Sequence, residues 1–281
     1  MRVALTLAVV ASLSSGVSAE PSNPAFLGIG MQDQMGQAPG AGTVIGPCII
    51  TETTPGSGAK QAGLLPNDIL QSIDGMPVSN CDAVLRIVQG HEPGDTIRVG
   101  LLRDGRRPLT IQAQLLSRAE ILRRRFGGQP IAPIELVGVH DEQRYDLRDQ
   151  RGKTVIVGWY DPAHCIGGSQ VFTRLAEWVR AEAGKSSAPP IALAATAANL
   201  DNPDELKKLR AVDLDVPLTW VEPLAFETLT IRDTKRIHFM VIDRFGIVRH
   251  VAPVLPTGDD VEAVLDELFA AAEQASRRAT K

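Results

Sequence analysis

The sequence predicts two consecutive domains, a mostly-β domain followed by an α/β sandwich. Up to about residue 117, short apolar runs rich in β-branched residues alternate with Gly, Pro, Asn and Asp, which is typical of strands joined by turns. From about residue 131, buried-type strands alternate with amphipathic helices, an order that produces an α/β layer structure. The 281 residues allow each domain to bury a core of its own.

The net charge of −4 gives no sign of an extended basic surface. Proteins that bind nucleic acid present such a surface, because they must neutralise phosphates. We therefore expect no nucleic-acid partner.

Residues 1–19 have the pattern of a secretory signal peptide. Arg2 supplies a positive charge, an apolar run follows over 3–10, and Val17-Ser18-Ala19 is a small-residue cleavage site. No other stretch approaches ~20 consecutive apolar residues, so no stable membrane span is expected after cleavage. We expect a periplasmic or secreted protein, with an uncleaved N-terminal anchor as the alternative.

The first domain is predicted to span residues 24–117. Strands are expected at 44–53, 96–105 and 109–115, and Asp104-Gly105 between the last two is a hairpin signal. The segment 81–89 has apolar residues at helical spacing after two candidate caps, Asn80 and Asp82.

Three strings in this domain resemble the PDZ domains of HtrA-type secreted proteases: FLGIGM at 26–31, TTPGSGAKQAGLLPNDILQSIDGMPV at 53–78 and GDTIRVGLLRDGRRPLTI at 94–111. The resemblance implies that the loop Phe26-Leu27-Gly28-Ile29 offers backbone N–H groups to the terminal carboxylate of a peptide. It further implies that the following strand pairs with the peptide backbone and that the 81–89 helix forms the other wall of the groove. The expected partners are therefore peptides or protein C-termini.

The chemistry of these residues suits such a groove. Gly28 lets the backbone approach a carboxylate closely, since it has no Cβ. The apolar groove residues are expected to be Ile29, Met31, Val84, Leu85 and Val88. The competing interpretation is that these side chains form the core, which for Leu85 is equally well supported.

A serine protease is not predicted, despite the resemblance. The sequence contains no GDSGG or GNSGG nucleophile string. Gly167-Gly168-Ser169 is a fragment of such a string in an unrelated context, with no preceding domain to supply a catalytic triad.

Residues 118–130 are predicted to be a linker. Four arginines, Arg118 and 123–125, precede Gly127-Gly128, which would end any short helix formed there. We interpret the arginines as a solvated face, with contact to anionic lipid or an acidic partner as the alternative. Flexible attachment of the two domains is the default expectation.

The second domain is predicted to span residues 131–276. Buried strands are expected at 154–160 and 190–197, helices at 169–183, 202–209 and 258–275, and a hairpin at 238–251. KTVIVGWYDPAHC at 153–165 and FMVIDRFGIVRH at 239–250 resemble the thioredoxin-like redoxins of the TlpA-like and peroxiredoxin-like branches. The resemblance implies a thioredoxin-like sandwich. It also implies that Cys165 lies at a helix N-terminus, with its pKa lowered by the helix dipole.

The sequence departs from the redoxin pattern at three places. The resolving cysteine is missing from Cys165-Ile166-Gly167-Gly168-Ser169, Ile237 stands where the family has a cis-proline, and Pro162 stands where peroxiredoxins have Thr or Ser. The strand-to-cysteine spacing also resembles Sco-type copper chaperones, with Ser169 in place of the second thiol and His164 or His238 as further candidate ligands. A lone cysteine and scattered histidines are poor metal ligands, so we expect neither metal nor cofactor.

Three functions of Cys165 remain open. A degenerate thioredoxin-like domain used for binding is favoured, because the partner thiol is missing. The alternative is an enzyme, a single-cysteine thiol-disulfide reductase or peroxidase that the PDZ domain targets to its clients. Cys165 is otherwise a metal ligand or an inert buried residue. Cys48 and Cys81 are able to pair if their backbones come close enough.

The sequence thus predicts an exported protein that binds peptides or proteins, and Cys165 is a catalytic residue only under the enzymatic alternative. A structural scaffold without thiol chemistry is the third class.

Overall fold

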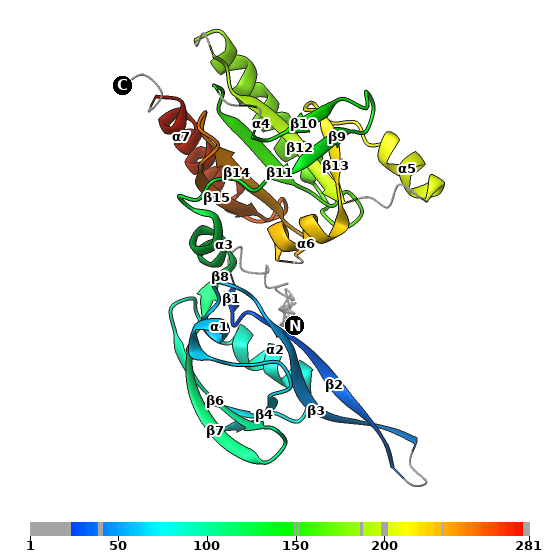
Figure 1. Ribbon diagram of the computed structural model, residues 1–281, viewed down its shortest axis with the longest axis vertical. Coiled ribbons are helices and arrows are strands. Elements are labelled where there is room, and N and C mark those ends of the chain that lie inside the picture. Colours follow the sequence, from blue (N-terminus) through cyan, green and yellow to red (C-terminus); the bar gives the residue numbers. More distant parts are fainter. Residues whose placement is uncertain are drawn as a thin grey trace, which may run out of the picture.

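The structure is a computed structural model that describes residues 24–38, 42–148, 150, 152–185, 188–197, 202–231 and 233–277. The predicted signal peptide lies outside the described residues. Figure 1 shows two domains joined at a helix, α3. None of the helices in the described part of the chain is long and apolar enough to cross a membrane.

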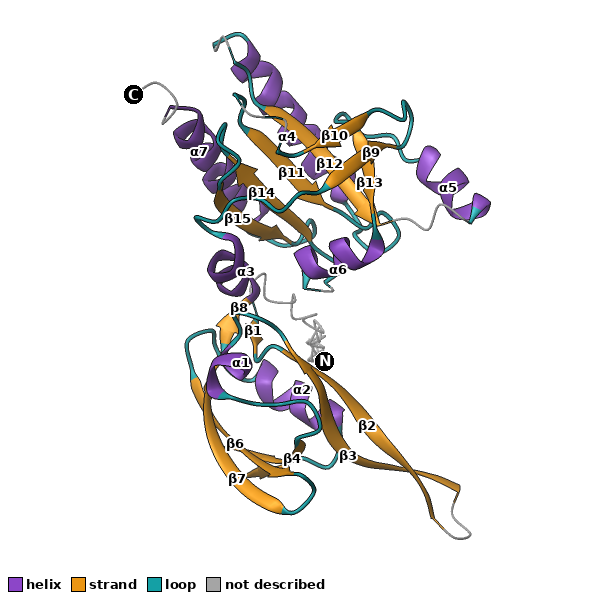
Figure 2. Ribbon diagram, viewed as in Figure 1, coloured by secondary structure: helices purple, strands orange, loops and turns teal. Residues whose placement is uncertain are grey.

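The first domain is a six-stranded antiparallel sheet with two short helices (Figure 2). Its strands run in the order β2-β3-β4-β6-β7, with β5 paired to β4. The elements are β1 (Ala25–Phe26), β2 (Ile29–Ala38), β3 (Gly42–Thr53), α1 (Gly58–Ala62), β4 (Ile69–Ile73), β5 (Met76–Pro77), α2 (Cys81–Gln89), β6 (Thr96–Arg103) and β7 (Arg107–Gln114). Strand β1 instead pairs with β8 (Leu116–Ser117) in a small separate sheet. Because β2 ends the sheet order, one of its edges has no strand neighbour among the described residues.

The predicted linker contains an ordered helix, α3 (Arg118–Phe126), which begins directly after β8. The Ser117 side chain accepts a hydrogen bond from Glu120 N and caps the helix, and Gly127 ends it. Leu122 is fully buried and belongs to the core of the second domain.

The second domain is a seven-stranded mixed sheet in the order β10-β9-β13-β12-β11-β14-β15. Its elements are β9 (Glu135–Gly138), β10 (Arg144–Asp146), β11 (Val155–Trp159), α4 (Gly168–Ala183), β12 (Ile191–Ala197), α5 (Pro203–Arg210), β13 (Leu218–Val221), α6 (Pro223–Thr230), β14 (Ile237–Ile242), β15 (Val248–Val254) and α7 (Val261–Arg277). Strands β11 and β12 are parallel around α4, and the β14–β15 hairpin adds antiparallel to β11 before α7. This β-α-β and β-β-α arrangement is the thioredoxin-like fold.

Each face of the second sheet is covered by helices. Ile156 of β11 packs on one face with Phe172 of α4 and Leu265 of α7. Trp159 of β11 packs on the other, in a cluster that holds Leu122 of α3 and Phe226 of α6. Strands β9, β10 and β13 and helix α6 were not predicted from the sequence, because they are too short to show a clear period.

Candidate functional site

In the loop before β2, the carbonyl groups of Leu27 and Gly28 accept hydrogen bonds from other residues of the first domain. Leu27 O accepts from Ala59 N at 3.1 Å, and Gly28 O accepts from Thr54 N at 2.8 Å and from the Ser57 hydroxyl at 3.2 Å. The N–H groups of Leu27 and Gly28 have no backbone partner among the described residues. Since the carbonyls are held from one side, the loop is suited to present N–H groups to an anion.

Gly28 is required in this loop by its geometry. Its φ of +83° lies in the left-handed region, and a Cβ there would come within 2.1 Å of the Ser57 Cβ. Any side chain at this position would therefore both strain the backbone and collide with Ser57.

The predicted groove residues fall into three groups. Phe26, Ile29 and Met31 are half-buried, whereas Leu27 is 3% exposed. Val84 and Val88 of α2 belong to the buried core, so the competing core interpretation applies to both. Leu85 is 48% exposed, and its side chain is therefore accessible to a ligand.

Helix α2 is attached to the strands beside it. A disulfide joins Cys81 at its first residue to Cys48 of β3, with the Cα atoms 4.8 Å apart. Asp33 of β2 accepts a hydrogen bond from Cys81 N at 2.7 Å, and Asn80 caps the helix through Ala83 N. The Asp33 carboxylate and the two sulfurs thus lie close together, but the sulfurs are bonded to each other. These contacts fix the position of α2 relative to β2.

In the second domain, Cys165 lies in the turn that leads from β11 into α4. Its N–H donates to Asp161 O at 2.9 Å, and Gly167 (φ +81°) and Gly168 start the helix after it. A Cβ on Gly168 would collide with the Tyr160 ring, so this close entry into α4 depends on glycine.

The Cys165 thiol is not activated by this position. It is 2% exposed, and burial raises its pKa to about 12, with Asp161 and Asp233 adding to the effect and Arg236 opposing it. The redoxin resemblance implied a lowered pKa for Cys165, whereas in the structure the pKa of this thiol is raised. The reason is that the sulfur packs into the hydrophobic core beside carboxylates.

The two candidate histidine ligands lie in different surroundings. His164 is exposed and its Nδ1 contacts Asp161 Oδ2 at 2.8 Å. His238 is fully buried, its Nε2 lies 3.1 Å from Asp233 O, and burial lowers its pKa to about 4. In the described part of the chain, neither histidine forms a ligand cluster with Cys165. Ile237 is fully buried at the expected cis-proline position, and no described residue has a cis peptide bond.

An ion cluster that the sequence did not suggest connects the two domains. Arg118, at the start of α3, lies 3.1 Å from Asp233 Oδ2, and Arg236 lies 2.9 Å from the same carboxylate. The Arg118 guanidinium also lies 4.6 Å from the centre of the Phe26 ring. Burial favours the neutral form of Asp233, but Arg118, His238 and Arg236 together outweigh it and lower the pKa of this carboxyl. The arginine run was the only signal in the sequence, and its favoured interpretation, a solvated face, does not hold for Arg118.

Two cavities accompany these groups. One of about 430 Å³ lies between the domains and is lined by Ile29, Gly30 and Glu52 of the first domain, by Arg118 and Arg125 of α3, and by residues of α6. Another, of about 640 Å³, is lined by residues 161–164 of the Cys165 turn and by parts of β12 and α5. Cys165 itself does not line the second cavity.

Comparison with known proteins identifies the first domain. A family model for the PDZ domain matches residues 25–114. The periplasmic pH-dependent serine endoprotease DegQ of Escherichia coli is 35% identical over 66 residues, and the magnetosome formation protease MamE of Paramagnetospirillum magneticum is 41% identical over 56 residues. These matches cover 24% and 20% of this chain, but only 14% and 8% of the two relatives.

The second domain is similar to solved thioredoxin structures. The exposed lipoprotein thioredoxin Etrx1 of Streptococcus pneumoniae is 18% identical, with a TM-score of 0.36, and the match covers 50% of this chain and 98% of that one. The family-model match confirms the predicted PDZ domain. The sheet order of the second domain, with β11 and β12 parallel and the β14–β15 hairpin antiparallel to β11, agrees with the predicted thioredoxin-like fold.

Proposed function

We propose that this chain is exported to the periplasm or secreted, and that it binds the C-terminus of a peptide or protein through its PDZ domain. The thioredoxin-like domain docks against the bound client and performs no thiol chemistry. The main support for this proposal is the edge of β2, which has no strand neighbour among the described residues. It lies next to the Leu27–Gly28 loop, whose carbonyl groups already accept hydrogen bonds within the domain.

This edge is suited to β-augmentation. A peptide strand that pairs with β2 satisfies backbone groups that have no strand neighbour within the described part of the chain. Leu85 offers an exposed apolar side chain on the helix beside that edge, and the disulfide and Asp33 hold this helix in place. Because α2 is already fixed in place, peptide binding would cost less conformational entropy.

The buried thiol supports binding rather than catalysis in the second domain. A nucleophilic cysteine requires a populated thiolate and access to its substrate, and Cys165 is buried with a pKa of about 12. The alternative, a thiol-disulfide reductase or peroxidase that uses Cys165, depends only on the position of this residue before α4.

Peptide binding by the full chain tests the proposal. We expect a fluorescein-labelled hexapeptide with a free C-terminal carboxylate, chosen as the tightest binder of a random library, to bind with micromolar affinity. Leu85→Lys should weaken that binding about tenfold or more, because it places a charge on the apolar groove wall.

Met76→Lys is the matched control. Met76 is 45% exposed, similar to Leu85, but lies in β5, which pairs with β4 and not with β2. Fluorescence polarisation should give wild-type affinity for this variant. If the library yields no binder, or if both variants bind like the wild type, the groove is not the binding site.

A further inference from the structure

The cavity between the domains lies next to the strand that would receive a peptide. Both Ile29 and Gly30, the first residues of β2, line it, and so do Leu224 and Thr228 of α6. Its volume of about 430 Å³ falls within the range of sites that hold small groups. The question is which part of a bound peptide would reach it.

The register of the strands answers this question. With the terminal carboxylate at the N–H groups of the Leu27–Ile29 loop, the last residue of a paired peptide lies beside Ile29 and the penultimate residue beside Gly30. Neighbours on adjacent strands point to the same face of the sheet, and successive residues to opposite faces.

The two faces of β2 have different surroundings, the domain core on one side and the outer surface on the other. Ile29 and Met31 pack against the domain core. Gly30 pairs with Glu52 of β3, whose side chain is exposed on the outer face, and both residues line the cavity. The penultimate side chain would therefore point outward and enter the space between the domains. Gly30 has no side chain of its own, and the Glu52 side chain lies over it, since a Cβ on Gly30 would come within 2.5 Å of the Glu52 Cγ.

The charged side chains that line the cavity indicate which kind of peptide side chain would bind there. Arg118 is engaged by Asp233 and Phe26, and Glu52 and Glu227 each have an interaction partner. Arg125 lies over the Phe126 ring at 4.8 Å, and among the described residues no carboxylate forms an ion pair with it. Its aliphatic part packs beside Gly56, which limits its exposure to water and lowers its pKa. A half-buried arginine without a carboxylate favours an acidic ligand group.

We propose that the thioredoxin-like domain and α3 form a specificity subsite for the penultimate residue of the bound peptide, and that Arg125 selects Asp or Glu there. This inference rests on the proposed PDZ function and assigns a role in recognition to the second domain.

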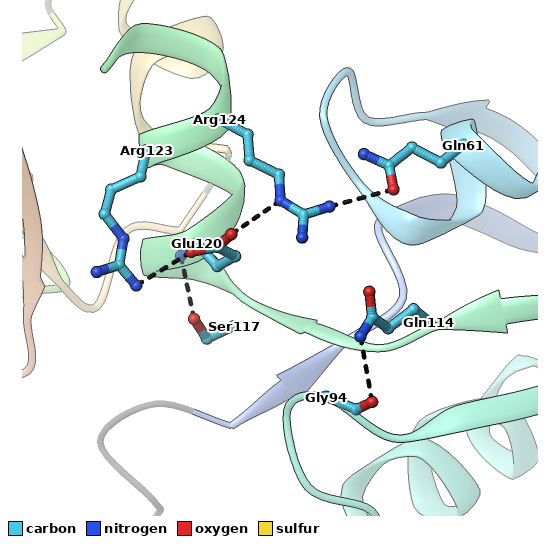
Figure 3. Close-up of polar contacts among 7 residues, drawn as sticks. All are labelled: Gln61, Gly94, Gln114, Ser117, Glu120, Arg123 and Arg124. Atoms are coloured by element: carbon cyan, nitrogen blue, oxygen red, sulfur yellow. Dashed lines mark hydrogen bonds and ion pairs between the residues drawn. The ribbon is translucent and has the colours of Figure 1, made fainter. Parts of the chain in front are cut away.

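The test uses the full chain and three versions of the library-selected hexapeptide, with Glu, Gln or Lys at the penultimate position. We expect wild-type protein to prefer Glu over Lys by about tenfold in Kd, as expected for a partly buried charge pair. Arg125→Gln should reduce this ratio to below about threefold. Arg123→Gln is the matched control, because Arg123 lies on the same helix but pairs with Glu120 and does not line the cavity (Figure 3).

A second variant tests the contribution of α6 independently of α3. Thr228 is exposed and lines the cavity from the thioredoxin-like domain, so Thr228→Glu should repel a penultimate Glu and reduce the same ratio. Peptide binding with no penultimate preference, or a preference unaffected by both variants, would contradict the subsite while leaving groove recognition intact. Absence of any peptide binding would contradict the proposed function and the subsite together.

Discussion

At the scale of single residues, the surroundings of Cys165 decide its chemistry more than its place in the sequence. The motif put this cysteine in a turn before a helix, and the structure confirms that position. Asp161 lies in the same turn as Cys165, but the burial of the thiol and the influence of Asp233 could not be predicted, because Asp233 is 68 positions away in the chain. The helix dipole is a weak effect compared with loss of solvation.

The reactivity of this thiol provides a direct prediction. At pH 8, a thiol with a pKa of about 12 is ionised to about one part in ten thousand. We therefore expect iodoacetamide to modify native Cys165 orders of magnitude more slowly than the same residue in guanidinium-unfolded protein, as followed by mass spectrometry. The disulfide keeps Cys48 and Cys81 out of the measurement. Equal rates in both states would support the enzymatic alternative.

Among the peptide-groove residues, the sequence was most informative where backbone geometry leaves one choice. The sequence indicated Gly28 because a residue without a Cβ lets the backbone approach a carboxylate, and the structure adds that only glycine fits the positive φ and the contact with Ser57. Val84, Leu85 and Val88 could not be told apart by period alone, since a helix packed beside a groove places apolar residues on both sides. The structure separates them by burial, with Leu85 outward and the two valines inward.

At the scale of elements, α3 is the part of the chain that the sequence described least completely. The glycines at its end and a short helix could be expected, but the arginine run suggested a solvated segment. In the structure, Leu122 on one side of α3 packs into the core of the second domain. On the other side, Arg124 Nη1 donates a hydrogen bond to Gln61 Oε1 of α1 at 3.1 Å (Figure 3). Glu120 pairs with both Arg123 and Arg124, so the arginines are partly neutralised within the helix.

Leu122→Ala tests whether α3 belongs to the second core. Removal of a fully buried leucine should lower the free energy of unfolding of the thioredoxin-like domain by about 2–4 kcal/mol. Trp159, Trp178 and Trp220 all lie in that domain, so tryptophan fluorescence during urea unfolding reports on it alone. Arg123→Ala, at an exposed position next in the chain, should leave the midpoint nearly unchanged. A linker without a core contact would give equal midpoints for both variants.

At the scale of the whole molecule, the two domains meet through a small number of side chains on segments distant in sequence. Arg118 contacts Phe26 of β1 and Asp233 of the second domain, and the cavity beside it is lined from both domains. Each fold could be predicted from local motifs, whereas this contact could not, because no periodicity or motif encodes it. It places the beginning of β2, the edge proposed to bind a peptide, next to the other domain.

Hydrogen–deuterium exchange of the full chain, with and without the selected hexapeptide, tests the central claim most directly. If peptides add a strand to β2, the amides of Leu27–Met31 should exchange more slowly in the complex, because new backbone hydrogen bonds protect them. Exchange in β7, at the opposite edge of the sheet, should stay unchanged and serves as the internal reference. Tight peptide binding without added protection at Leu27–Met31 would contradict recognition at this edge.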